Sequence, residues 1–95
     1  MAKLILSEQD IINALCVYTA RNKQIAPEQV EAELIYDEDT GFSAEVCWAN
    51  RKQVLIMVNL VEALRLWLKE YMNEDPFLGI KLELDENQGI IAFVG

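Results

Sequence analysis

The hydrophobic positions near the start of the chain recur at the spacing of an α-helix. Apolar side chains in residues 11–19 lie three and four positions apart, which predicts one buried helix face. Ser7 and Asp10 form the S-x-x-D pattern of a capping box just before this segment. We therefore expect a helix that begins at Ser7 and ends near Lys23, before Pro27.

The period changes to two in the next segments, which predicts a β-hairpin. Hydrophobic and polar residues alternate over residues 30–37 and again over residues 42–49. The acidic stretch between them ends at Gly41, a residue that suits the positive φ of a tight turn. The register that keeps both hydrophobic faces inward pairs Tyr36 with Phe42.

Residues 54–58 read Val-Leu-Ile-Met-Val, an apolar run that is hydrophobic on both faces of a strand. We predict a strand over residues 52–58, near the middle of the sheet, which follows a turn at residues 50–51. An apolar outer face would need a cover, and another molecule is one candidate. The length of the turn decides which side chains point outward: Val54, Ile56 and Val58 after two residues, or Leu55 and Met57 after three.

A second helix is predicted from Asn59, which suits an N-cap and is followed three residues later by Glu62. Residues 80–85 alternate, residues 86–89 suit a turn, and residues 90–94 are all apolar, which predicts a second hairpin. Residues 90–94 are apolar enough for the middle of the sheet. The order is α-β-β-β-α-β-β, and each helix has one apolar stripe. We expect an α+β fold, a two-layer sandwich with both helices on one face of an antiparallel sheet.

The composition is that of a single small domain spanning residues 1–95. Hydrophobic residues make up 53% of the chain, enough for a core that needs neither disulfides nor metal. The chain has 16 acidic and 8 basic residues, and the net charge of −8 disfavours nucleic acid as a partner. No uncharged stretch approaches the roughly 20 apolar residues of a membrane span, so we expect no membrane partner and a cytoplasmic location.

Residue patterns for catalysis or metal binding are scarce. The chain has no histidine, so the commonest general base and the commonest metal ligand are missing. Its two cysteines, Cys16 and Cys47, form no C-x-x-C pair, which predicts free thiols in a reducing compartment. We therefore expect no catalytic site, no metal and no cofactor, and an enzyme is disfavoured.

Two carboxylates face each other in the predicted hairpin. The register that pairs Tyr36 with Phe42 places Glu33 opposite Glu45 on the outer face. Facing like charges cost up to ~1 kcal/mol, which a neighbouring Lys or Arg, a cation or a raised carboxyl pKa would relieve. We interpret the pair as part of a solvated sheet face, with an acid/base site as the alternative.

Several stretches of the chain have distinctive amino-acid sequences. Residues 6–14 read Leu-Ser-Glu-Gln-Asp-Ile-Ile-Asn-Ala, residues 41–46 read Gly-Phe-Ser-Ala-Glu-Val, and residues 51–56 read Arg-Lys-Gln-Val-Leu-Ile, with Glu62-Ala63 and Leu66-Trp67-Leu68 following. With these stretches, nearly the whole chain resembles the YxcD-type small bacterial proteins, a domain family of unknown function. The resemblance implies a single-domain cytoplasmic protein and no particular activity, cofactor or catalytic residue.

These observations leave three functional hypotheses. The first is a non-enzymatic protein-interaction or self-associating module, either a homo-oligomer or the binder of an unidentified protein, which uses the outer sheet face around residues 54–58. Its expected interface residues are Ile35, Cys47, Leu55 and Met57. The second is a small-ligand binder with a groove between helices and sheet, walled by Tyr18, Trp48, Trp67 and Tyr71. The third is an enzyme that uses Glu33, Glu45 or Cys47.

Overall fold

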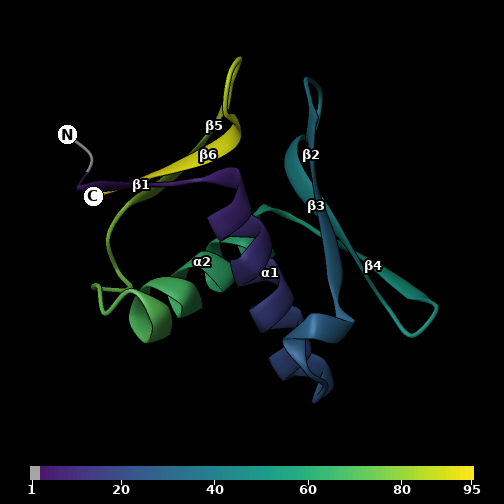
Figure 1. The fold of residues 1–95 in the computed structure, drawn as a ribbon. Coiled ribbons are helices and arrows are strands. Elements are labelled where there is room, and N and C mark those ends of the chain that lie inside the picture. Colours follow the sequence, from purple (N-terminus) through teal and green to yellow (C-terminus); the bar gives the residue numbers. More distant parts are fainter. Residues whose placement is uncertain (1–2) are drawn as a thin grey trace.

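The structure is a computed structural model that describes residues 3–95 (Figure 1). The helices are α1 (Glu8–Lys23) and α2 (Met57–Tyr71), and a short 3₁₀-helix, η1, spans Pro27–Gln29. The strands are β1 (Leu4–Leu6), β2 (Glu31–Asp37), β3 (Gly41–Trp48), β4 (Arg51–Leu55), β5 (Ile80–Asp85) and β6 (Gly89–Val94). This is the α+β class that the sequence predicts.

The strands form two antiparallel sheets of three strands each. One has the order β1-β6-β5 and the other has the order β2-β3-β4, so the single sheet that we expected is divided in two. Residues 90–94 belong to the middle strand of their sheet, as predicted. In the other sheet the middle strand is β3, and residues 52–58 contribute only to an edge. The added strand β1 has three residues, too few to show a period in the sequence.

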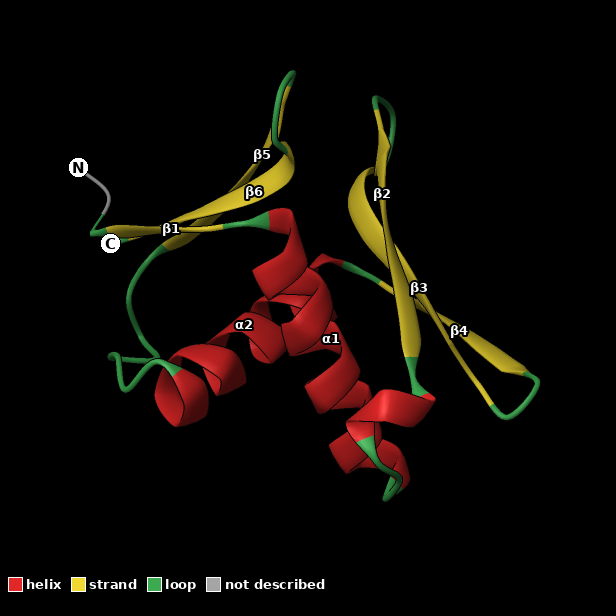
Figure 2. Ribbon diagram, in the orientation of Figure 1, coloured by secondary structure: helices red, strands yellow, loops and turns green. Residues whose placement is uncertain are grey.

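The two helices pack across each other, and α1 lies between the two sheets (Figure 2). Helix α1 contacts β6 in one sheet and β2 and β3 in the other, while α2 packs on α1 and contacts β3 and β4. The largest fully buried side chains come from both helices and both sheets: Leu6, Ile11, Leu15, Val46, Leu55, Leu60, Leu64, Leu68 and Val94. One core thus joins all the layers, and among the described residues neither helix is long and apolar enough to cross a membrane.

Ser7 caps α1 as its position in the sequence predicts. The Ser7 Oγ accepts a hydrogen bond from the N–H of Asp10 at 3.1 Å, and Asp10 Oδ2 accepts one from the Ser7 N–H at 3.1 Å. Both backbone donors would otherwise lack a partner at the helix start. At the other end Gln24 adopts the left-handed conformation with φ of 59°, which ends the helix after Lys23.

The strand predicted over residues 52–58 ends early. Strand β4 stops at Leu55, Ile56 is the N-cap of α2, and the helix begins at the next residue. Asn59 is therefore not the N-cap with Glu62 behind it. Instead its Oδ1 accepts a hydrogen bond from the Ile56 N–H at 3.0 Å. An apolar residue can occupy the cap position here because a side chain three residues later satisfies its backbone donor.

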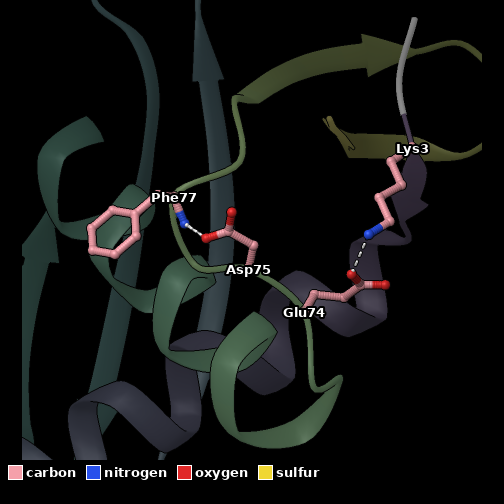
Figure 3. Close-up of polar contacts among 4 residues, drawn as sticks. All are labelled: Lys3, Glu74, Asp75 and Phe77. Atoms are coloured by element: carbon pink, nitrogen blue, oxygen red, sulfur yellow. Dashed lines mark hydrogen bonds and ion pairs between the residues drawn. The ribbon is translucent and has the colours of Figure 1, made fainter.

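Polar contacts hold the irregular segment between α2 and β5 (Figure 3). Glu74 Oε1 accepts a hydrogen bond from Lys3 Nζ at 2.8 Å, which ties this segment to the residue before β1. Asp75 Oδ1 accepts one from the Phe77 N–H at 2.9 Å in a local turn. Arg65 of α2 donates to the carbonyl oxygen of Pro76. The backbone is thus fixed, while the Phe77 ring remains exposed.

Candidate functional site

A cluster of exposed apolar side chains lies where β4 passes into α2. We call Val54, Ile56, Met57 and Val58 the junction patch; Val54, Ile56 and Val58 expose 58%, 60% and 57% of their surface. Single exposed apolar residues are ordinary, but contiguous ones mark interaction sites more often than other surface does. The junction patch is therefore the candidate functional site.

The turn before β4 determines which side chains face outward. Ala49 and Asn50 form a two-residue turn with φ values of 44° and 63°, and Trp48 pairs with Arg51 across it. Positive φ at both central positions is the geometry of the tight hairpin turns that match strand twist. Of the two turn lengths considered, the shorter one is present, and it points Val54 outward.

The four predicted interface residues lie in different surroundings. Leu55 pairs with Ala44 on the inner face and is only 2% exposed, so its side chain does not lie on the outer face. The two-residue turn is the reason, because it sets the alternation that buries this position. Met57 is exposed in the first turn of α2, Ile35 is exposed on the outer face of β2, and Cys47 is half-buried on the outer face of β3.

The register of the β2–β3 hairpin is the predicted one. Tyr36 pairs with Phe42, with ring centroids 5.0 Å apart, and Glu33 pairs with Glu45. Lys52 of β4 lies beside this acidic pair, with Nζ 3.3 Å from Glu45 Oε1. A neighbouring cation was one of the expected ways to relieve the repulsion, and exposed ion pairs of this kind contribute up to about 1 kcal/mol.

The acidic pair lines a shallow hollow of about 150 Å³ on the outer face, next to the junction patch. Glu31, Ala32, Glu33, Glu45 and Cys47 form its walls. An open surface with these side chains can attract cationic groups. Among residues 3–95 there is no group of three or more Cys, Asp or Glu side chains arranged to hold a metal ion. The structure therefore brings the predicted acidic pair together with one predicted interface residue, Cys47.

The four aromatic residues proposed as walls of a ligand groove are dispersed. Tyr18 lines a cavity beside α1, and Trp48 lines a separate hollow near the β3–β4 turn. Trp67 and Tyr71 stack on each other along α2, with ring centroids 4.6 Å apart, and line neither of these spaces. Lys23 lies over the Trp48 ring, 5.1 Å from its centroid. Neither of these two spaces is therefore shared by all four aromatic residues.

A small polar cavity of about 50 Å³ between α1, β4 and α2 was not predicted from the sequence. Its walls are Tyr18, Thr19, Asn22, Lys23, Gln53, Leu55 and Asn59. The buried hydroxyl of Thr19 has no protein hydrogen-bond partner within residues 3–95. A cavity of this size has room for water-sized groups that could satisfy it. No pattern in the sequence marks this threonine, since it lies on the predicted apolar stripe of α1.

Both cysteines are free thiols, as expected. Cys16 Sγ lies 3.4 Å from the carbonyl oxygen of Val30 and donates to it. Burial raises the pKa of the Cys16 thiol above its ordinary value, because the thiolate would lose hydration there. A thiol that stays neutral is a poor nucleophile, so Cys16 is a structural residue.

Comparison with known proteins identifies the family. The family model described as "Protein of unknown function (DUF2653)" matches residues 1–87. The chain belongs to the DUF2653 family. It is similar to the uncharacterized protein YxcD of Bacillus subtilis (strain 168), with 36% identity over 94 residues that cover 97% of this chain and 92% of that relative. No solved structure matches the chain. The resemblance to YxcD-type proteins is thus confirmed.

Proposed function

We propose that this DUF2653 protein is a non-enzymatic interaction module that binds another protein chain through the junction patch. The observation that carries the proposal is the exposure of Ile56 between two further exposed side chains, Val54 and Val58. Fully burying one such side chain is worth roughly 1.5–3 kcal/mol. Covering all three would therefore offset a substantial part of the entropy that two chains lose on association.

The charge around the junction patch supports a protein partner as well. No acidic residue occurs between Glu45 and Glu62, although the whole chain carries a net charge of −8. The same stretch contains the adjacent cations Arg51 and Lys52. Carboxylates of a partner would be attracted to these two cations.

We assign the module to the cytoplasm. Cys16 and Cys47 are both free thiols, and thiols persist in reducing compartments, whereas secreted proteins usually pair them. A fluorescent fusion that localised to the cell surface or the periplasm would contradict this assignment.

Photo-crosslinking in the native cells tests the proposed function. A photoreactive amino acid replaces Val58 in one strain and Leu84 in another; both side chains are 57% exposed, but Val58 lies in α2 and Leu84 lies in β5. We expect a discrete protein adduct at position 58 and none at position 84. Ile56→Glu in the same chain should abolish the adduct, while Ile5→Glu, at an exposed position of β1, should leave it. Equal labelling at both positions, or no adduct at position 58, would refute the proposal.

A further inference from the structure

The two sheets have four edge strands, and β4 is the edge best suited to pair with another chain. Strand β2, the other edge of its sheet, carries Glu31, Glu33 and Asp37, so two copies of it would repel each other. Strand β5 is also charged and β1 has only three residues. Strand β4 has five residues, two cations but no acidic side chain, and four exposed positions, and within residues 3–95 it pairs with β3 alone.

The turn also determines which backbone groups of β4 point away from β3. The residue pair that flanks a two-residue hairpin turn exchanges hydrogen bonds, and bonded pairs then alternate with non-bonded pairs along the strands. Here the flanking pair is Trp48 and Arg51, so every second residue after Arg51 is bonded to β3. Lys52 and Val54 are the intervening residues, and their N–H and C=O groups face the free edge.

We propose that β4 pairs in antiparallel orientation with β4 of a second copy of this chain, about a two-fold axis at Gln53. The three-stranded sheets of the two copies would then form one continuous sheet. This rests on the proposed function and names its partner. With Gln53 on the axis, Lys52 of each chain lies opposite Val54 of the other. The register therefore matches the outward N–H and C=O groups of one copy with those of the other.

The same register is favourable for the side chains. On the outer face Val54 lies between Glu45 of its own chain and Lys52 of the second copy, so a cation approaches a carboxylate across an apolar residue. Ile56 comes to lie beside the turn formed by Ala49 and Asn50 of the second copy, which covers an exposed side chain. Since β4 has no acidic residue, this contact avoids much of the repulsion between two chains of net charge −8.

Sedimentation equilibrium and hydrogen exchange on the purified full chain test the proposal. At tens of micromolar we expect twice the 10.9 kDa mass of one chain. The amides of Lys52 and Val54 should become more protected as concentration rises, whereas the Gln53 amide, bonded within its own sheet, should be protected at every concentration. A monomeric mass, or exchange at Lys52 and Val54 that ignores concentration, would overturn the proposal.

A matched pair of substitutions at Val54 isolates the backbone contact. Val54→Pro removes an N–H that only the second chain would use, and proline is tolerated at edge positions whose N–H faces away from the sheet. We expect its dimer dissociation constant to rise at least about tenfold. Val54→Thr keeps both the N–H and the branched shape and should leave the constant within about threefold. Equal dimer dissociation constants for the two variants would refute the pairing. If Val54→Pro fails to fold, the amide hydrogen exchange of Lys52 and Val54 in the unaltered chain tests the pairing instead.

The proposed function and this inference fail in different experiments. A cross-link from position 58 to a different protein, with a monomeric purified chain, overturns the dimer and leaves the proposed function standing. A dimer whose Lys52 and Val54 amides stay unprotected overturns the β4 pairing but not the proposed function. The absence of any adduct at position 58 together with a monomeric mass overturns both.

Discussion

The Glu8 carboxylate accepts a hydrogen bond from the backbone N–H of Ile90, with Oε2 2.9 Å from the nitrogen. This bond joins the first residue of α1 to the second hairpin, and it is partly buried. The neighbouring Gly89 has φ of 77°, and a Cβ at this position would collide with the Glu8 carboxylate. A side chain at this position would therefore strain the backbone and would also displace the Glu8 carboxylate from Ile90.

Gly89→Ala should destabilise the protein more than Gly41→Ala. Both glycines have positive φ, 77° and 82°, so both substitutions bear a conformational cost of about 1 kcal/mol. Only Gly89→Ala also displaces Glu8 from Ile90, which adds roughly 1–3 kcal/mol, because nothing lies within 4 Å of a Cβ built at Gly41. Urea unfolding of the two variants measures the difference. Equal free energies of unfolding would show that the Glu8 contact contributes nothing.

Glu33→Lys should stabilise the β2–β3 hairpin by up to about 1 kcal/mol, because it replaces a like-charge pair with Glu45 by an opposite-charge pair. The gain should shrink in 1 M salt, where the screening length falls to about 3 Å. Glu31→Lys is the matched control, since Glu31 pairs with the uncharged Cys47. Thermal unfolding at low and high salt gives both comparisons. A gain of the same size in the control would assign it to net charge rather than to the facing pair.

Cys16 should react slowly with alkylating reagents in the folded protein. Burial raises the pKa of its thiol, so less of the reactive thiolate is present at a given pH than in the unfolded chain. The rate measured for a Cys47→Ser variant in native buffer and in urea tests this. Equal rates in the two conditions would contradict it.

The raised pKa of Cys16 also makes the stability of the protein depend on pH. Because the pKa of the Cys16 thiol is raised in the folded protein, the thiol of the unfolded chain loses its proton at lower pH. The free energy of unfolding therefore falls as pH rises from the ordinary pKa to the folded one. The stability of Cys16→Ser should therefore fall less steeply with pH in the alkaline range than that of the unaltered protein.

Glu70 should titrate below its ordinary range. Its hydrogen bond from Arg21, which joins α1 to α2, lowers the pKa of the Glu70 carboxyl, with a smaller contribution from Lys69. A lowered pKa means that this contact stabilises the fold at neutral pH and is lost as pH falls through the folded value. Carboxyl NMR titration should show the pKa of Glu70 returning upward in Arg21→Gln. Arg65→Gln, which removes the bond to Pro76 instead, should leave it lowered.

The sequence predicted local structure correctly where a residue pattern had a single physical interpretation. The S-x-x-D pattern at Ser7 predicted the cap of α1, and the alternation around Gly41 predicted the register that pairs Glu33 with Glu45. Residues 54–58 were different, because an apolar run fits a strand and the first turn of a helix equally well. The hydrogen bond from the Ile56 N–H to Asn59 stabilises the start of the helix at this point. The signal in the sequence was Asn59 itself, three residues after the N-cap Ile56.

The division into two sheets could not be predicted from local pattern. Which strands pair depends on contacts between distant segments, such as Leu6 with Ala92. The stripe of α1 contacts both sheets at once, and a stripe alone does not reveal how many sheets it covers. The buried state of Leu55 depended on the length of one turn, and both lengths were compatible with the residues present.

The hydrogen bond between Asn59 and Ile56 also limits the length of the exposed edge. Because the backbone turns into α2 directly after Leu55, β4 offers only Lys52 and Val54 for pairing with another chain. An edge this short cannot slide through successive registers, and the acidic strand β2 closes the far side of the same sheet against stacking. The chain can thus offer one edge strand for pairing, while the short length of that strand and the acidic opposite edge oppose the growth of open-ended fibrils.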